Sequence, residues 1–116
     1  MQIPKPSEAD KALFRSIVPD DPRVEVKPMF GNLGAFVNGN MFMGLFGSDI
    51  GVKLSPADAA TLLGLDGAGS FGPAERPMGG YVSLPVSFRA APEGADWIAR
   101  ALEHVGALPA KVATRR

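Results

Sequence analysis

Apolar residues change their spacing along the chain, and the changes mark out a helix followed by a run of strands. After Ser7, a residue type common at helix N-termini, apolar side chains recur on one helical face as far as Pro19. Two prolines and two aspartates over residues 19–22 predict a turn there. Over residues 24–54, short apolar runs are interrupted by Gly and Asn, a pattern that predicts an antiparallel meander of strands.

The next part of the chain predicts a helix, a glycine-rich loop and one more strand. Residues 55–64 predict a helix, because the segment starts with a capping serine and a proline and ends with glycine. Residues 65–77 are rich in glycine and predict a loop, with Phe71 inserted into the core as its anchor. The apolar run over residues 81–86 predicts a strand, which Pro85 either stops early or confines to a sheet edge.

A last helix completes the fold. Pro92 opens a segment whose apolar residues form one continuous stripe, and Gly106 ends it. The order α-β-β-β-β-α-β-α predicts the α+β class: one domain over residues 1–116, with two layers, an antiparallel sheet of about five strands, and helices mainly on one face. Residues 109–116 hold three basic residues and no acid, and are expected to form a flexible basic tail.

Two short turns fix the register of the strands and therefore the face on which each side chain lies. Asn38-Gly39 suits a two-residue type I′ hairpin, and Gly47-Ser48 is expected to form a second tight turn. Strict alternation along each strand then defines two faces. The face expected to be the core holds Phe36, Met41, Met43, Leu45, Ile50, Val52 and Leu54. The face expected to lie away from the helices holds Leu33, Ala35, Val37, Phe42, Phe46 and Lys53, with bare positions at Gly34, Gly44 and Gly51.

The face away from the helices is the candidate binding surface. Its lysine stands beside aromatic side chains and over a flat floor of glycines, where the backbone of a ligand or partner can lie close. The alternative is a solvated lysine that protects an exposed sheet face from aggregation. The candidate binding residues are Phe42, Phe46, Lys53, Arg76 and Tyr81.

No sequence pattern indicates catalysis. The chain has no cysteine and a single histidine, His104, so thiolate chemistry is excluded and an imidazole cluster has too few members. Residues 67–72 match G-x-G-x-x-G, but they follow a helix end and lead into proline, so the strand-to-helix context that nucleotide binding requires is missing. We expect no enzyme activity, no cofactor and no metal.

Net charge and the lack of targeting signals limit which partners and which cellular location we expect. The 12 basic and 12 acidic residues give a formal net charge of zero, so the broad positive field of a strong nucleic-acid binder is absent and direct, strong nucleic-acid binding is not expected. The first ten residues contain prolines and charges where a secretory signal would be apolar. The most apolar stretch, Met41 to Gly47, is too short to cross a membrane. We expect a cytoplasmic protein that does not enter membranes.

Two segments and one helix resemble the TfoX/Sxy N-terminal domain family. They are KPMFGNLGAFVNGNMFMGLFGSDIGVKL at residues 27–54, FGPAERPMGGYVSLP at residues 71–85, and the helix from Trp97 to Ala101. Together they cover roughly residues 24–111. Asn32 departs from the pattern, since a second glycine is usual there.

The resemblance implies a fold and a cellular context. The fold is a small antiparallel sheet with helices packed mainly on one side, similar to secretion-chaperone-like folds. The context is the regulation of natural competence, in which this domain is often followed by a C-terminal domain. Because the chain ends at Arg116, we expect a stand-alone N-terminal domain. The family contributes no catalytic residues.

Two function classes follow. The first is a small non-enzymatic regulatory or interaction module that binds a protein partner and is linked to competence or transcription regulation. The second is a small-molecule or peptide-binding domain in which the loop at residues 65–77 acts as a glycine-rich lid. A sheet with one helix-free side also favours a homodimer.

Overall fold

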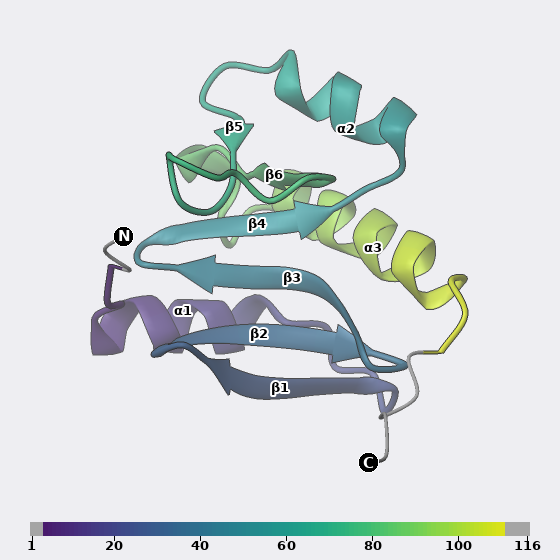
Figure 1. Ribbon diagram of the computed structural model, residues 1–116, viewed down its shortest axis with the longest axis horizontal. Helices are drawn as coiled ribbons and strands as arrows, with labels where there is room; N and C mark the ends of the chain where they lie inside the picture. The colour runs from purple at the N-terminus through teal and green to yellow at the C-terminus, as the bar shows by residue number, and fades with distance from the viewer. Residues whose placement is uncertain (1–3, 111–116) are drawn as a thin grey trace.

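Six strands form one antiparallel sheet in the order β1-β2-β3-β4-β6-β5; α1 and α3 pack against one face of it, and α2 packs against β6 near the β5 edge (Figure 1). The computed structural model describes residues 4–110. The helices are α1 (Glu8–Ile17), α2 (Pro56–Leu63) and α3 (Pro92–Gly106), with a short 3₁₀ helix η1 (Val86–Phe88), and the strands are β1 (Val24–Met29), β2 (Asn32–Val37), β3 (Asn40–Phe46), β4 (Asp49–Lys53), β5 (Gly69–Ser70) and β6 (Tyr81–Ser83). The predicted two-layer α+β architecture is confirmed. The sheet has one strand more than expected, because two residues of the glycine-rich segment pair with β6.

The N-terminal ends of α1 and α2 follow from local chemistry. The Ser7 hydroxyl accepts a hydrogen bond from the Asp10 backbone N–H at 3.0 Å, and the Asp10 carboxylate accepts one from the Ser7 N–H at 2.9 Å. This reciprocal pair satisfies two N–H groups that the helix leaves unbonded, and the bond from the Ser7 backbone lowers the pKa of Asp10. At α2 a single bond of this kind is present, from the Asp58 N–H to the Ser55 hydroxyl at 3.2 Å.

Two hairpins of the sheet share one turn geometry with different residues in it. Asn38 and Gly39 have φ of 53° and 80°, which confirms the predicted left-handed turn between β2 and β3. Phe30 and Gly31, between β1 and β2, have nearly the same angles, 51° and 82°. Asparagine tolerates left-handed backbone, whereas phenylalanine rarely adopts it. The β1–β2 turn is therefore built on an unfavourable residue.

A β-bulge at Phe42 reverses the predicted faces of β2 and of the first residues of β3, while the rest of β3 and β4 lie on the predicted faces. Phe36 pairs with Met41 as expected, but Ala35 pairs with Met43, so Phe42 has no partner on β2. The bulge turns Phe42 into the core next to Met43, and both are fully buried. Strict alternation is therefore broken within β3. The side chains predicted to lie on the outer face but found in the core are Leu33, Ala35, Val37 and Phe42, and those predicted in the core but found on the outer face are Phe36 and Met41.

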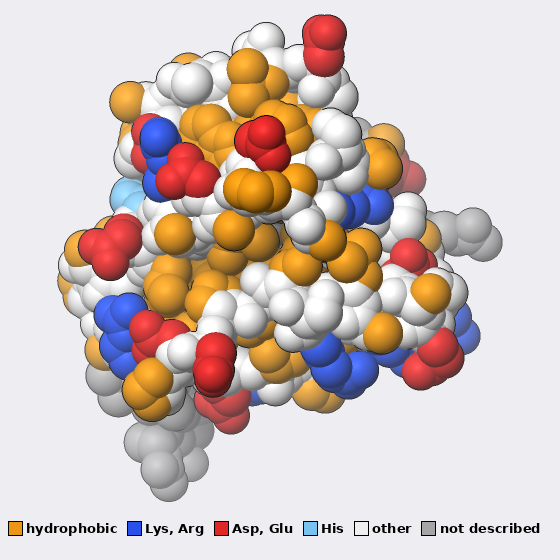
Figure 2. Space-filling view, turned by 180° about the vertical axis from the view of Figure 1, so that it is seen from behind, with side chains coloured by type: hydrophobic (Ala, Val, Ile, Leu, Met, Phe, Trp, Pro, Cys, Tyr) orange, Lys and Arg blue, Asp and Glu red, His pale blue; other side chains and the backbone are white. Residues whose placement is uncertain are grey.

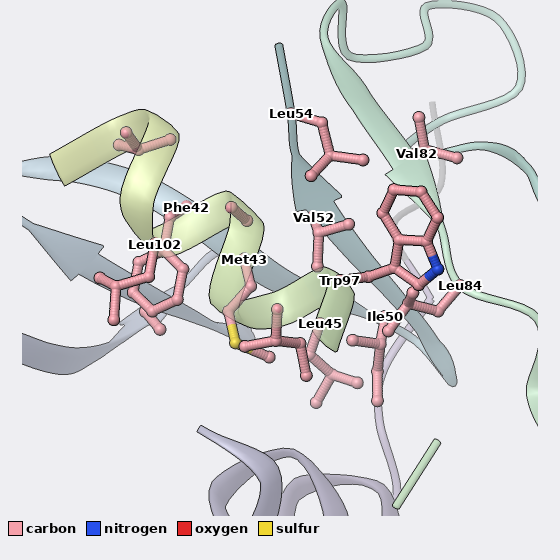
Figure 3. Close-up of a cluster of buried hydrophobic side chains, with 14 of the residues drawn as sticks. Phe42, Met43, Leu45, Ile50, Val52, Leu54, Val82, Leu84, Trp97 and Leu102 are labelled. Carbon is pink, nitrogen blue, oxygen red and sulfur yellow. The ribbon is translucent and has the colours of Figure 1, made fainter. Parts of the chain in front are cut away.

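The core lies between the sheet and the helices. Figure 3 shows Trp97 and Leu102 of α3 among side chains of β3, β4 and β6. The buried hydrophobic side chains of the strands are Leu33, Ala35, Val37, Phe42, Met43, Leu45, Ile50, Val52 and Val82. The Arg100 guanidinium lies over the Trp97 ring, with its central carbon 4.7 Å from the ring centroid.

The helix side of the molecule has a mixed surface. Figure 2 shows acidic and basic side chains interspersed around hydrophobic ones on this side. In the part of the chain drawn there, no large area of a single charge is visible. No helix in the described residues is long and apolar enough to cross a membrane.

The end of the chain is only partly described. After α3, the Pro109 carbonyl accepts a hydrogen bond at 3.1 Å from the side-chain amide of Asn40 at the β2–β3 turn. Of the predicted basic tail, residues 111–116 lie outside the described residues.

Candidate functional site

A cavity of about 320 Å³ opens on the outer face of the sheet, the face away from the helices. Its floor comes from β3, where Gly44 leaves a bare position; the glycine-rich segment covers one side, and the β1–β2 turn borders another. The described residues that line it are Met29, Phe30, Asn32, Leu33, Met41, Gly44, Leu45, Phe46, Phe71, Pro73 and Met78. None of these side chains is ionisable, and all but that of Asn32 are apolar or absent.

Phe71 holds the glycine-rich segment onto this face. Its ring is 2% exposed and lies over Gly51 of β4, where any side chain would overlap it. It meets the ring of Phe46 edge-on, with centroids 6.2 Å apart. The Met78 N–H closes the segment by donating to the Phe71 carbonyl at 2.8 Å. The expectation that Phe71 anchors the loop is correct, but the anchor is buried on the outer face and not in the core.

Tyr81 extends the aromatic row to the other side of Phe71. The two rings are 6.1 Å apart, and the Tyr81 hydroxyl donates to the Met41 carbonyl at 2.8 Å. Met41 adjoins the bulged Phe42, so this bond ties β6 to the irregular part of β3. Burial raises the pKa of Tyr81 to about 12. The Lys53 ammonium lies 5.6 Å from the centroid of the Tyr81 ring.

The structure brings together three of the five candidate binding residues. Phe46, Lys53 and Tyr81 lie on the outer face, with the Phe71 ring between Phe46 and Tyr81. Arg76 is exposed in the glycine-rich segment, where its backbone N–H donates to the Pro73 carbonyl at 3.0 Å. The placement of Phe42 on this face was wrong, because the bulge turns the ring into the core.

Of the cavity residues contributed by loops, Phe30 and Pro73 were missed, whereas for Met78 the sequence offers two interpretations, an adaptable methionine surface and, as the favoured one, core filling. Phe30, Pro73 and Met78 come from segments outside regular strands, so no alternation rule assigns them a face. One signal was available. Phe30 precedes a glycine in a two-residue turn between strands, a position that strongly favours Asn, Asp or Gly, so an aromatic residue there is unusual.

Titration of Tyr81 offers a direct check of this environment. Because Tyr81 is the only tyrosine, the ultraviolet absorbance of tyrosinate reports on it alone. We expect half-ionisation near pH 12 in the folded chain and near pH 10 after denaturation. Since the unfolded state loses its proton first, the free energy of unfolding should fall as the pH rises from 10 to 12. The Tyr81→Phe variant should lack this part of the pH dependence; ionisation near pH 10 in the folded chain would contradict the buried hydroxyl.

These features define a two-layer α+β domain whose free sheet face is hollowed by an apolar cavity. The model of the TfoX N-terminal domain family matches residues 16–105 of the 116. The chain therefore belongs to this family, which confirms the resemblance seen in the sequence. No curated protein matches the chain. The residues that line the cavity all lie within residues 27–54 and 71–85, the two segments that carry the resemblance.

Proposed function

We propose that this chain is a non-enzymatic interaction module whose outer-face cavity receives an apolar side chain of a protein partner. The observation that carries the proposal is the lining: methionine, phenylalanine, leucine, proline and glycine surround a space of about 320 Å³. A side chain that enters this space leaves water without giving up a hydrogen bond, which favours binding.

The scarcity of free polar groups in the cavity favours a partner's side chain over a metabolite as the bound group. Small-molecule sites usually combine apolar walls with a few polar groups that orient the ligand. Here the one polar side chain is that of Asn32, and it is already bonded: its amide nitrogen donates to the Pro4 carbonyl at 3.1 Å, and its oxygen accepts from the Gly47 N–H at 2.8 Å. A partner's backbone can supply the orientation that the cavity lacks.

Methionine makes the lining adaptable. Met29, Met41 and Met78 border the space, and their unbranched thioether chains adjust to differently shaped apolar groups. Met43, in contrast, is fully buried in the core on the other side of the sheet. Met43 can therefore serve as an internal control for binding at the three cavity methionines.

The cavity can be tested with N-acetyl-phenylalaninamide as the probe and methionine methyl NMR signals as the readout. We expect the methyl signals of Met29, Met41 and Met78 to shift with increasing probe, while that of Met43 stays in place. N-acetyl-alaninamide, which has no ring, is the control and should shift none of the four. Equal shifts with both amides, or shifts confined to Met43, would contradict the proposal.

A second candidate is the binding of a small apolar molecule or peptide, with the glycine-rich segment as a lid. The observation in its favour is that Phe71 and Pro73 of this segment, with Met78 directly after it, form one side of the cavity. A ligand that binds only the folded state raises the melting temperature. A metabolite or acyl-chain library that produces such a rise in the wild type, but not in a variant with Met78→Glu, would favour this candidate over a protein side chain.

Family membership supports a proposed context in competence or transcription regulation, inside the cytoplasm. Deletion of the gene should then lower transformation frequency or alter transcript levels. Restoration by the wild type, but not by a variant with a charged residue at Met41, would assign the effect to the cavity. An unchanged transformation frequency and transcriptome would count against the context while leaving the binding proposal in place.

A further inference from the structure

We propose that the protein partner is a second copy of this chain, and that Phe30 of each copy enters the outer-face cavity of the other. This inference rests on the proposed function of the cavity and names its partner. It follows from two features of one small area: an exposed aromatic side chain and an apolar hollow beside it.

Phe30 is unfavourable where it stands unless something covers it. It is 79% exposed, the most exposed of the large hydrophobic side chains in the described part of the chain. Its φ of 51° places it in left-handed backbone, which phenylalanine rarely adopts. Asn38 has a φ of 53° in the next hairpin and shows which residue type this turn geometry accepts readily. An exposed aromatic in a strained turn points to a contact that requires the ring there.

The projecting ring and the cavity lie on the same face and share a border, since Phe30 itself contributes to the cavity wall. Being largely exposed, the ring stands at the mouth and does not fill the space. A surface that carries a projection next to a matching hollow is complementary to itself, which is the requirement of a two-fold symmetric contact. The size is sufficient: an apolar cavity of about 150 Å³ can hold benzene, and this one measures about 320 Å³.

The two edges of the sheet are less suited to pairing two copies, and β5 at one of them has only two residues. β1 is an edge strand, and Pro28 within it has no N–H to donate to a neighbouring strand. Charged residues on such strands oppose further pairing, and β1 carries Glu25 and Lys27, whose charged groups are 3.9 Å apart. Contact through the outer face avoids these obstacles. With a formal net charge of zero, two copies do not repel each other at long range.

The test is the oligomeric state of the full chain, measured by sedimentation equilibrium over a range of concentrations. The wild type is expected to form a reversible dimer. Phe30→Asn removes both rings from the contact and should weaken the dimer by roughly 100-fold or more. The same change places the preferred residue type in the turn, so the variant should fold. Its melting temperature should lie roughly 3 °C above that of the wild type measured at concentrations too low for the dimer to form.

Two further variants assign the effect to the ring. Phe30→Leu keeps an apolar side chain and should retain a measurable dimer. Leu63→Asn removes another exposed hydrophobic side chain, 50% exposed at the end of α2, and should leave the dimer unchanged. A wild type that stays monomeric, or equal dimerisation of the wild type and Phe30→Asn, would overturn the inference.

The amide probe separates this inference from the proposed function. If Phe30 of a second copy occupies the cavity, Phe30→Asn should bind N-acetyl-phenylalaninamide at lower probe concentrations than the wild-type dimer. Probe binding by a monomeric wild type would overturn the dimer and leave the proposed function standing. A dimer that forms while neither protein binds the probe would refute the cavity as its contact.

Discussion

Replacing Phe42 by alanine is expected to destabilise the fold by about 3–5 kcal/mol. The ring is fully buried at the bulge of β3, within the core cluster that includes Met43 and Leu102. Its removal leaves a space that the rigid sheet can only partly close, so apolar contacts are lost as well as burial. Chemical denaturation followed by Trp97 fluorescence measures the change, since this is the only tryptophan.

Phe36→Ala is the matched control for this prediction. Phe36 is half-buried on the outer face, where the Lys27 ammonium lies 4.9 Å from its ring centroid. We expect a loss of about 1 kcal/mol. Had the strands alternated without a bulge, the order of the two effects would be reversed, so a larger loss at Phe36 than at Phe42 would contradict the observed register.

Replacing Gly51 by alanine is expected to be the most damaging change on the outer face. A Cβ at this position would overlap the ring of Phe71, so either the ring leaves its site or β4 moves. The two effects, overpacking and exposure of an aromatic side chain, together should lower the free energy of unfolding by about 2–4 kcal/mol. Because Phe71 also lines the cavity, the methyl shifts caused by N-acetyl-phenylalaninamide should be lost in the same variant.

Gly69→Ala provides the comparison. Gly69 lies in β5, and a Cβ built there meets no other atom within 4 Å. The expected change in stability is within about 0.5 kcal/mol, with probe binding retained. A loss at Gly51 no greater than that at Gly69 would show that the Phe71 ring is not held against β4.

The helices and turns could be predicted because their signals are local. Ser7 and Ser55 each offer a hydroxyl to the first helical turn, and both are N-caps in the structure. Asn38-Gly39 suits left-handed backbone, and that hairpin forms with the expected pairing of Val37 with Asn40. In each case one or two residues determine the conformation, with little influence from distant parts of the chain.

The faces of the sheet could not be assigned from β2 and β3 alone. Both faces of these strands are apolar, so a shift of one residue leaves the hydrophobic pattern equally good. A clearer signal lies in β1, where Val24 and Val26 alternate with charged residues. The β1–β2 pairing places Val26 opposite Ala35, which puts Ala35 on the core side. Carrying the alternation across that turn would have exposed the conflict that the bulge resolves.

The cavity was beyond sequence reasoning for a different reason. Gly44 and Gly51 were recognised as bare positions on the outer face, but glycine does not indicate what will cover it. The covering side chain, Phe71, is eight residues beyond the end of α2 within an irregular segment. Its contacts with Gly51, Phe46 and Tyr81 hold it on this face, and those contacts depend on the assembled sheet.

Asn32 borders the cavity, and its side-chain amide holds the Pro4 carbonyl by a hydrogen bond. This bond determines where a label should be attached to the chain. Any fusion partner or affinity tag attached ahead of residue 4 would therefore emerge from the domain beside the mouth of the outer-face cavity. Pro109 is bonded by Asn40 at the β2–β3 turn, and Asn32 stands at the other end of β2. Surface attachment points, fluorophores and purification tags should be placed near the β2–β3 turn, where they will not block binding at the cavity.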